Sequence, residues 1–143
     1  MNEDIDKRAD TSRADIWHAM SDLYLDEEMT VGAYLYVAKR LASSGFSVDE
    51  LEEIFFNEVH PVCCWNFTVP AGEWGLFDRE WLKEKISLEM RRDRPRTWRE
   101  RMWTKQREKE MKKLKELVRC DWEKVKLLVT VIRERGLREI ASE

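Results

Sequence analysis

Four titratable side chains gather on one side of a helix predicted near the N-terminus. The stretch IWHAMSDLYLDEE covers residues 16–28, and at 100° per residue its apolar side chains lie opposite a polar group: Asp15, His18, Asp22 and Asp26. A histidine among carboxylates could ligate a metal, exchange protons, face solvent or bind a basic partner. Zinc needs further nitrogen or sulfur ligands, and acid–base catalysis needs a carboxyl group removed from water. The position opposite the apolar side favours a solvated face, with a protein-docking surface as the alternative.

A second candidate site is the motif H-x-x-C-C, formed by His60, Cys63 and Cys64. The motif suggests zinc binding or a cysteine nucleophile with a histidine base. However, the second ligand pair of a zinc site is missing, and adjacent cysteines do not easily face one ion. We expect both thiols to be buried as small hydrophobic side chains, with no bound metal or other cofactor. Cys120 makes the cysteine count odd, which indicates no disulfide framework and fits a reducing cytosol.

The loop AGEWGLF, residues 71–77, places Gly72 and Gly75 on either side of Glu73 and Trp74. This spacing suits a tight turn that presents an aromatic ring. No predicted strand precedes the loop, so a phosphate-binding loop is not indicated. We expect Trp74 to fill the core while Glu73 satisfies backbone donors, and the alternative is a contact with a partner.

A basic segment follows, with 12 Lys or Arg and 4 acidic residues between positions 91 and 115. Arginine can bind phosphate and tryptophan can stack on bases, so the segment is a candidate nucleic-acid site. Its tryptophans are Trp98 and Trp103, and its candidate phosphate ligands are Arg91, Arg94, Arg96 and Arg99. We favour the alternative, that the basic helix pairs with acidic helices of the same molecule or is simply solvated.

The composition predicts that helices position these residues. Only five glycines and three prolines occur among 143 residues, while 43% are hydrophobic and 38% are charged. We predict an all-α, compact single domain over residues 1–143, with about five to six helices and a long packed loop between the third and fourth. Residues 1–90 contain 19 acidic and 8 basic residues, a balance of −11, whereas the balance of residues 91–143 is +8. The domain therefore combines an acidic core with a basic C-terminal helical segment.

Apolar spacing and capping residues predict the helix boundaries. The first four helices are predicted over residues 12–25, 30–44, 48–59 and 79–92. N-caps are predicted at Thr30, Ser47, Asp78 and Thr97. Pro61 is predicted to end the third helix and to start a packed loop over residues 60–77. The core is predicted to include Trp17, Met20, Leu23, Tyr34, Leu41, Leu51, Phe55, Trp81 and Ile86.

The segment after Trp98 has two possible forms. Its apolar residues keep a 3-4 rhythm as far as Ile132, with Asp121 in one core position. Either one helix continues to residue 135, or the helix breaks near Asp121, which would cap a last helix. We expect the break, because so long a helix is unusual in a small domain.

Three strings in a fixed order resemble a family of small cytosolic proteobacterial proteins that is an uncharacterised domain of unknown function. The strings are RADIWHAMSDLYLDEE, YLYVAKRLASSGFSVDELEEIFFNEVHPV and AGEWGLFDREWL. The resemblance covers Arg13 to Ile86 and implies no catalytic residues. The basic segment after Met90 departs from the family pattern.

These observations predict a protein that is not an enzyme, since no nucleophile–base pair, metal quartet or phosphate loop is indicated. In size, acidity and lack of catalytic motifs the chain resembles immunity proteins, which neutralise a toxin as in toxin–antitoxin pairs. The leading hypothesis is a non-catalytic protein-binding module that captures a cognate basic protein through its acidic surface. That surface would consist of Asp15, Asp22, Asp26, Glu27, Glu28, Glu73 and Trp74. The alternative is a nucleic-acid-binding or regulatory protein that uses residues 91–115.

The sequence also predicts where the protein works. No apolar run is long enough to span a membrane, and nothing before the first predicted helix resembles a secretory signal. We expect a cytoplasmic monomer or homodimer that makes no contact with a membrane.

Overall fold

The computed structural model describes residues 13–25, 29–68, 78–92 and 95–141. In these ranges the chain is all-α, and no strand is present. A first helix covers residues 13–21, and a 3-10 turn follows at Asp22–Tyr24. The remaining α-helices are α2 (Val31–Ala42), α3 (Val48–Ile54), α4 (His60–Cys63), α5 (Arg79–Met90) and α6 (Trp98–Ala141). None of these described helices combines the length and apolar character needed to cross a membrane.

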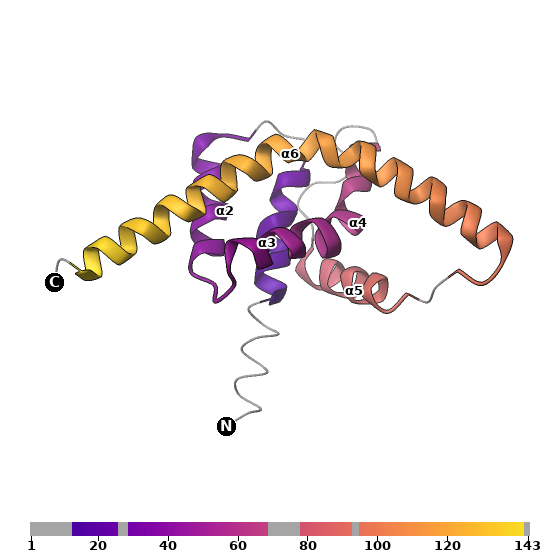
Figure 1. Cartoon of the computed structure of the whole chain (residues 1–143), viewed down its shortest axis with the longest axis horizontal. Coiled ribbons are helices and arrows are strands. Elements are labelled where there is room, and N and C mark those ends of the chain that lie inside the picture. Colours follow the sequence, from indigo (N-terminus) through magenta and orange to yellow (C-terminus); the bar gives the residue numbers. More distant parts are fainter. Residues whose placement is uncertain (1–12, 26–28, 69–77, 93–94, 142–143) are drawn as a thin grey trace, which may run out of the picture.

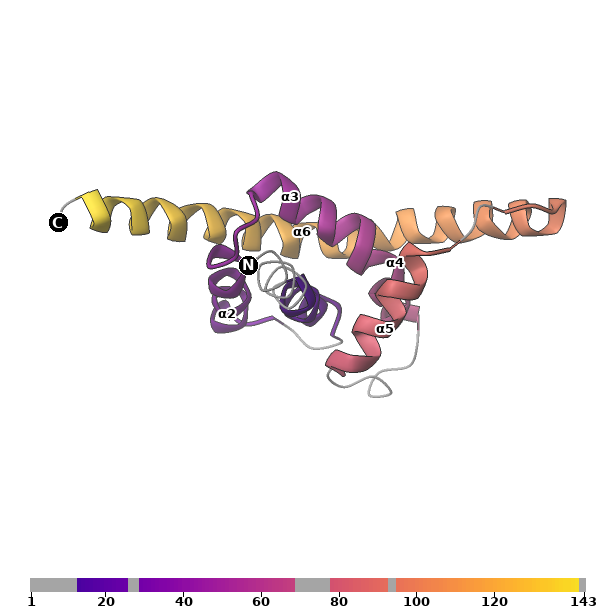
Figure 2. The ribbon, with the colours of Figure 1, turned by 90° about the horizontal axis from the view of Figure 1, so that it is seen from below.

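The long helix α6 lies across all the other elements, which pack along one side of it (Figure 1). Its 44 residues correspond to about 66 Å at the rise of an α-helix. Seen from below, both ends of α6 continue past the body formed by the shorter helices (Figure 2). Its most extensive contact is with α2. The two ends of one continuous helix, which curves over the body in Figure 1, therefore project from it.

The expected break near Asp121 is wrong, and the buried stripe of α6 gives the physical reason. Buried side chains recur every three or four residues without interruption: Leu114, Val118, Trp122, Val125 and Val129. The core position next to Asp121 is occupied by Trp122, while Asp121 lies half-buried and accepts a hydrogen bond from the Tyr34 hydroxyl. Because packing on the body stabilises every turn of this stripe, no cap is required and the helix continues.

Trp122 is the central contact between α6 and the body. Its ring stacks on Phe55, with centroids 4.7 Å apart and planes 12° from parallel. Its indole Nε1 donates to Glu52 Oε1 at 3.0 Å, and Lys126 Nζ lies 3.2 Å from the same oxygen. The indole hydrogen bond, followed by the one from Lys126, holds the pKa of Glu52 below its usual value. The largest buried side chain of α6 thus has its one polar atom satisfied.

Arg133 fixes α6 to the end of α2, more than two turns beyond Trp122. Its guanidinium donates to two carbonyls of the last turn of α2, those of Leu41 and Ala42, and to two that follow it, those of Ser44 and Phe46, at 2.6–3.3 Å. The last carbonyls of a helix lack partners further along the helix, and this side chain supplies donors for them.

The prediction that Pro61 ends the third helix is wrong. The chain continues from α3 through a π-helical turn at Phe55–Val59 into α4, and then into a 3-10 turn at Cys64–Thr68. Pro61 stands in the first turn of α4, directly after the π-helical turn. Residues 60–68 of the expected loop are therefore helical, and residues 69–77 lie outside the described residues.

Most local predictions are confirmed. The four N-cap side chains accept the expected backbone hydrogen bonds at 2.9–3.1 Å: Thr30 from Ala33, Ser47 from Glu50, Asp78 from Trp81 and Thr97 from Glu100. Seven of the nine predicted core residues are buried, whereas Tyr34 and Trp81 are half-buried. Tyr34 stays near the surface because its hydroxyl reaches Asp121 and its ring lies 5.2 Å from the Lys124 ammonium.

We expect Trp122→Ala to lower the free energy of unfolding by about 3–5 kcal/mol, because it leaves a cavity against Phe55 and removes the indole hydrogen bond to Glu52. Urea denaturation followed by circular dichroism measures this change. The matched control is Trp98→Ala, which removes a side chain that is 72% exposed and should change stability by no more than about 0.5 kcal/mol. Equal losses in both variants would contradict the central position of Trp122.

Candidate functional site

The acidic side of the first helix is partly neutralised where the structure describes it. Asp15 Oδ1 lies 2.7 Å from Arg79 Nη2 and 4.0 Å from Arg40 Nη2. Asp22 is half-buried, and burial raises the pKa of its carboxyl group, against the charges of His18 and Arg40. The other residues proposed for the acidic surface lie outside the described residues: Asp26, Glu27, Glu28, Glu73 and Trp74. Within the described ranges, no three His, Cys, Asp or Glu side chains are grouped so as to hold a metal ion.

His60 is buried, and both of its ring nitrogens are engaged. Nε2 lies 2.8 Å from the Met111 carbonyl oxygen, and Nδ1 lies 2.8 Å from the Tyr24 hydroxyl. Since a carbonyl oxygen only accepts, Nε2 carries the proton and Nδ1 accepts the hydrogen bond from Tyr24. Burial lowers the pKa of His60, the Met111 carbonyl opposes this change, and the charge of Lys115 adds to it. A neutral His60 therefore connects the 3-10 turn at Asp22–Tyr24 to α6.

Cys63 and Cys64 are fully buried, which confirms the expectation that they pack as small hydrophobic side chains. Burial raises the pKa of the Cys64 thiol to about 12 and that of Cys63 well above its usual value. The thiolate is the nucleophilic form of cysteine, so neither side chain is activated for chemistry at neutral pH. The motif H-x-x-C-C is thus part of the core.

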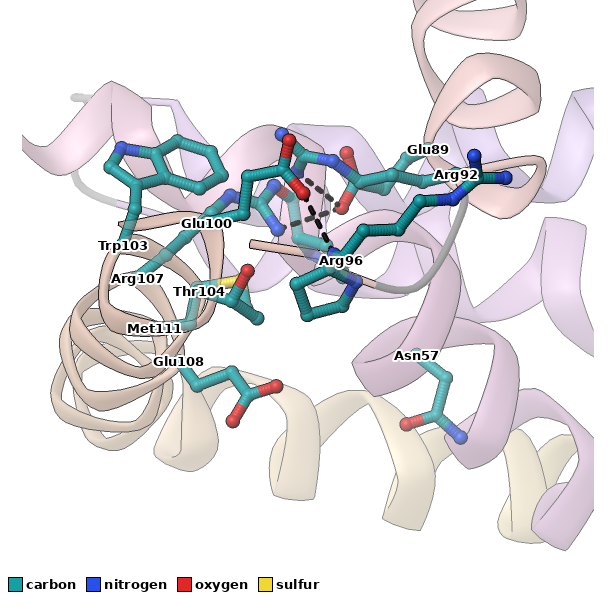
Figure 3. A pocket seen from close by; sticks show the side chains of 12 residues that line it. Asn57, Glu89, Arg92, Arg96, Glu100, Trp103, Thr104, Arg107, Glu108 and Met111 are labelled. Carbon is teal, nitrogen blue, oxygen red and sulfur yellow. Dashed lines mark hydrogen bonds and ion pairs between the residues drawn. The ribbon is translucent and has the colours of Figure 1, made fainter. Parts of the chain in front are cut away.

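A cleft of about 690 Å³ opens between the α4 region, the end of α5 and the first turns of α6 (Figure 3). Its size falls within the usual range of ligand pockets. Apolar and polar side chains both line it: Asn57, Pro61, Glu89, Arg92, Pro95, Arg96, Glu100, Trp103, Thr104, Arg107, Glu108 and Met111. Sequence periodicity alone does not reveal this cleft, because it forms only where α5 and α6 diverge.

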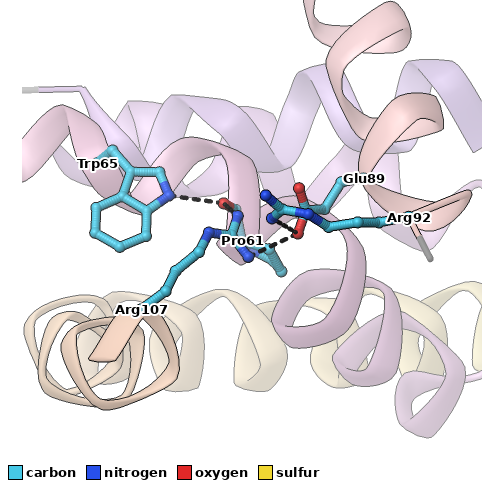
Figure 4. A network of polar contacts seen from close by, with 5 residues as sticks. All are labelled: Pro61, Trp65, Glu89, Arg92 and Arg107. Carbon is cyan, nitrogen blue, oxygen red and sulfur yellow. Dashed lines mark hydrogen bonds and ion pairs between the residues drawn. The ribbon is translucent and has the colours of Figure 1, made fainter. Parts of the chain in front are cut away.

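A network around Glu89 closes one wall of the cleft (Figure 4). Arg107 Nη1 lies 2.7 Å from Glu89 Oε1, and its Nη2 donates to the Pro61 carbonyl at 3.1 Å. Arg92 lies 3.5 Å from the same carboxylate oxygen, and its guanidinium lies 4.7 Å from the Trp103 ring centroid. Part of the basic segment is thus paired within the molecule, as the alternative reading of that segment anticipated.

Five other cations of the segment have no such partner. Arg99, Arg101, Lys105, Lys109 and Lys112 are all exposed, and we call them the basic face. None of them forms an ion pair within the described residues. Helical periodicity directs them away from the buried stripe of α6. Lys105, Lys109 and Lys112 follow one another at i, i+4 and i+7, so they form a single row of about 10 Å.

The acidic residues of the same segment do not neutralise this face. Glu100 accepts hydrogen bonds from the backbone N–H groups of Arg96 at 2.8 Å and Thr97 at 3.3 Å, which lower its pKa. Glu110 pairs with Lys113 at 3.6 Å, and Glu108 lines the cleft. The outward side of α6 before residue 113 therefore carries five cations that no carboxylate of the described residues pairs with.

The four arginines predicted as phosphate ligands do not form one surface. Arg91 is exposed and donates through Nε to the Ser87 carbonyl, Arg96 lines the cleft, and Arg99 belongs to the basic face. Arg94 lies outside the described residues. The prediction missed the lysine row, which the i, i+4, i+7 spacing within a continuous helix could have revealed.

Together these features define an all-α protein in which one long helix carries a basic face beside a cleft. The chain belongs to a family described as a domain of unknown function (DUF7079), whose model matches residues 11–128. The match reaches well beyond Ile86, so the expected departure from the family after Met90 is wrong, and the basic face is part of the family domain. No curated protein and no solved structure matches the chain.

We expect the free energy of unfolding to fall as the pH decreases from about 7.5 to 5.5. The pKa of His60 is lower in the folded state than the unfolded value of about 6.5, so the unfolded state binds more protons in this window. The stabilisation is present above that unfolded value and is lost below it. Denaturation in urea at several pH values measures the slope, which should flatten in His60→Gln.

Urea denaturation of His18→Gln at the same pH values measures how much the other histidine contributes to the slope. An unchanged slope in His60→Gln would contradict the buried, neutral state assigned to His60.

Proposed function

We propose that the protein is a non-catalytic nucleic-acid-binding protein that holds the phosphate backbone on the basic face of α6. The observation that carries this proposal is the uniform sign of that face. Its five cations are free of ion pairs within the described residues, while Glu100 and Glu110 are engaged elsewhere. A polyanion that binds there releases counterions and displaces no intramolecular partner.

The position of the face also supports the proposal. The first turns of α6 project beyond the body (Figure 2), so a long polymer can lie along them without meeting the acidic helices. Trp98 is 72% exposed at the start of the same helix, and Met102 follows it one turn later. An exposed tryptophan among cations is a surface on which a base can stack.

The non-catalytic part of the proposal rests on the state of the candidate nucleophile and base. Cys63 and Cys64 are buried thiols with raised pKa values, and His60 uses both ring nitrogens in structural hydrogen bonds. Neither arrangement leaves a group in position to transfer a proton or attack a substrate.

The hypothesis of an acidic surface that captures a basic toxin stays a prediction. This hypothesis is supported by the negative charge balance of residues 1–90. The described members of that surface, Asp15 and Asp22, are ion-paired and half-buried respectively. The basic face therefore has the stronger structural support.

The test is the salt dependence of binding to a fluorescent single-stranded oligonucleotide, followed by anisotropy. The triple variant Lys105→Ala, Lys109→Ala, Lys112→Ala should bind more weakly at low salt. The slope of log K against log salt should fall by about 2, since three phosphate contacts are removed at about 0.7 each.

The matched control is Lys39→Ala, Lys83→Ala, Lys85→Ala, which removes three exposed lysines of α2 and α5 and gives the same net charge. It should keep the wild-type slope. If both triple variants lose affinity equally, net charge alone governs binding and the proposed face is wrong. If the wild-type protein does not bind at low salt, the proposed function is wrong.

A further inference from the structure

We propose that the cleft beside the basic face accepts an unpaired nucleobase of a bound strand, so that the protein prefers single-stranded nucleic acid. This inference rests on the proposed function, because the strand is delivered by the basic face. The two sites adjoin along α6: Thr104 and Glu108 line the cleft, and basic-face residues lie three or four positions from them, next to them on the helix surface, namely Arg101, Lys105 and Lys112. A strand held by the lysines needs only to turn one nucleotide inward.

The charges of the cleft differ between its two ends, as Figure 3 shows. Arg92 and Arg96 lie at one end, beside the carboxylates of Glu89 and Glu100. Arg92 is paired with Glu89, whereas the Arg96 guanidinium forms no ion pair within the described residues, so Arg96 suits the phosphate of the inserted nucleotide. Glu108 and Asn57 face the cleft at the other end, and Glu108 forms no ion pair within the described residues. A carboxylate repels phosphate but accepts N–H groups from a base edge, and an amide both donates and accepts. The polarity of the cleft thus matches that of a nucleotide.

An aromatic surface between the two ends suits the base itself. Trp103 lines the cleft and is 53% exposed. The guanidinium of Arg92 lies 4.7 Å from its centroid and that of Arg107 lies 5.8 Å from it, which fixes the ring at the wall. The apolar side chains of Pro95 and Met111 also line the cleft. A planar base can stack on such a surface whatever its sequence.

A base within a duplex cannot reach this surface without leaving its stack. Insertion from a duplex costs the unpairing and unstacking of that base, whereas a single strand has no pairing to break. The basic face alone would bind both forms through phosphate contacts. A preference for the single strand is therefore the specific consequence of the cleft.

The experiment compares three probes of equal length at one salt concentration by anisotropy: a single-stranded DNA, the same backbone with abasic sites, and a duplex. The wild-type protein should bind the base-containing strand about tenfold more tightly than the abasic strand, as expected for one stacked base. Thr104→Phe fills the cleft and should lower the affinity for the base-containing strand toward that for the abasic strand, leaving only the contribution of a base stacked on Trp98. Its affinity for the abasic strand, set by the intact basic face, should not change.

Trp103→Leu removes the stacking surface at an exposed position and should give the same result as Thr104→Phe. The matched control is Gln106→Phe, which introduces the same side chain on an exposed position outside the cleft and should keep the wild-type preference. Equal wild-type affinity for base-containing and abasic strands, or for the duplex, overturns the inference while the proposed function stands. Failure to bind any of the three probes overturns the proposed function itself.

Discussion

The stacking of Trp122 on Phe55 places one uninterrupted helix across the body, and the rest of the molecule depends on this contact. Trp122 lies near the middle of α6, where the indole is buried and hydrogen-bonded to Glu52. Arg133 fastens the following turns to the end of α2 through four backbone carbonyls. Because α6 is held in its centre and C-terminal half, its first turns must extend past the body. The basic face belongs to this extension, and the cleft lies between the extension and the body.

The position of each cation along α6 decides what it does. Three cations face the body, where they form ion pairs with carboxylates or donate hydrogen bonds to carbonyls: Arg107, Lys126 and Arg133. Such contacts position the helix and leave little charge for a ligand. The cations of the basic face point away from the body, so their charge remains available to a polyanion. The helical period thus places the cations that hold α6 on the body on one side of the helix and the cations that could bind a ligand on the other.

The sequence allowed the fold class, the N-caps and most of the core to be predicted, because these follow from local spacing and short-range hydrogen bonds. Ser47 and Asp78, for example, need only the backbone N–H three residues on. Pro61 and Asp121 misled the boundary predictions, since a π-helical turn and a packed Trp122 replace the expected breaks. The cleft was not predictable, because it depends on the divergence of α5 and α6 and on Arg107 bridging Glu89 and Pro61. These two contacts of Arg107 join residues that are separated by 18 and by 46 positions in the sequence.

The indole N–H signals of the seven tryptophans offer the most direct test of where a strand binds. In a nitrogen–proton correlation spectrum, adding a single-stranded oligonucleotide should shift the signals of Trp98 and Trp103. The signals of Trp17 and Trp122 should stay in place, because their indole N–H groups donate to Glu58 and Glu52 within the body. Shifts confined to Trp17 and Trp122, or the absence of any shift at low salt, would contradict binding at the basic face of α6.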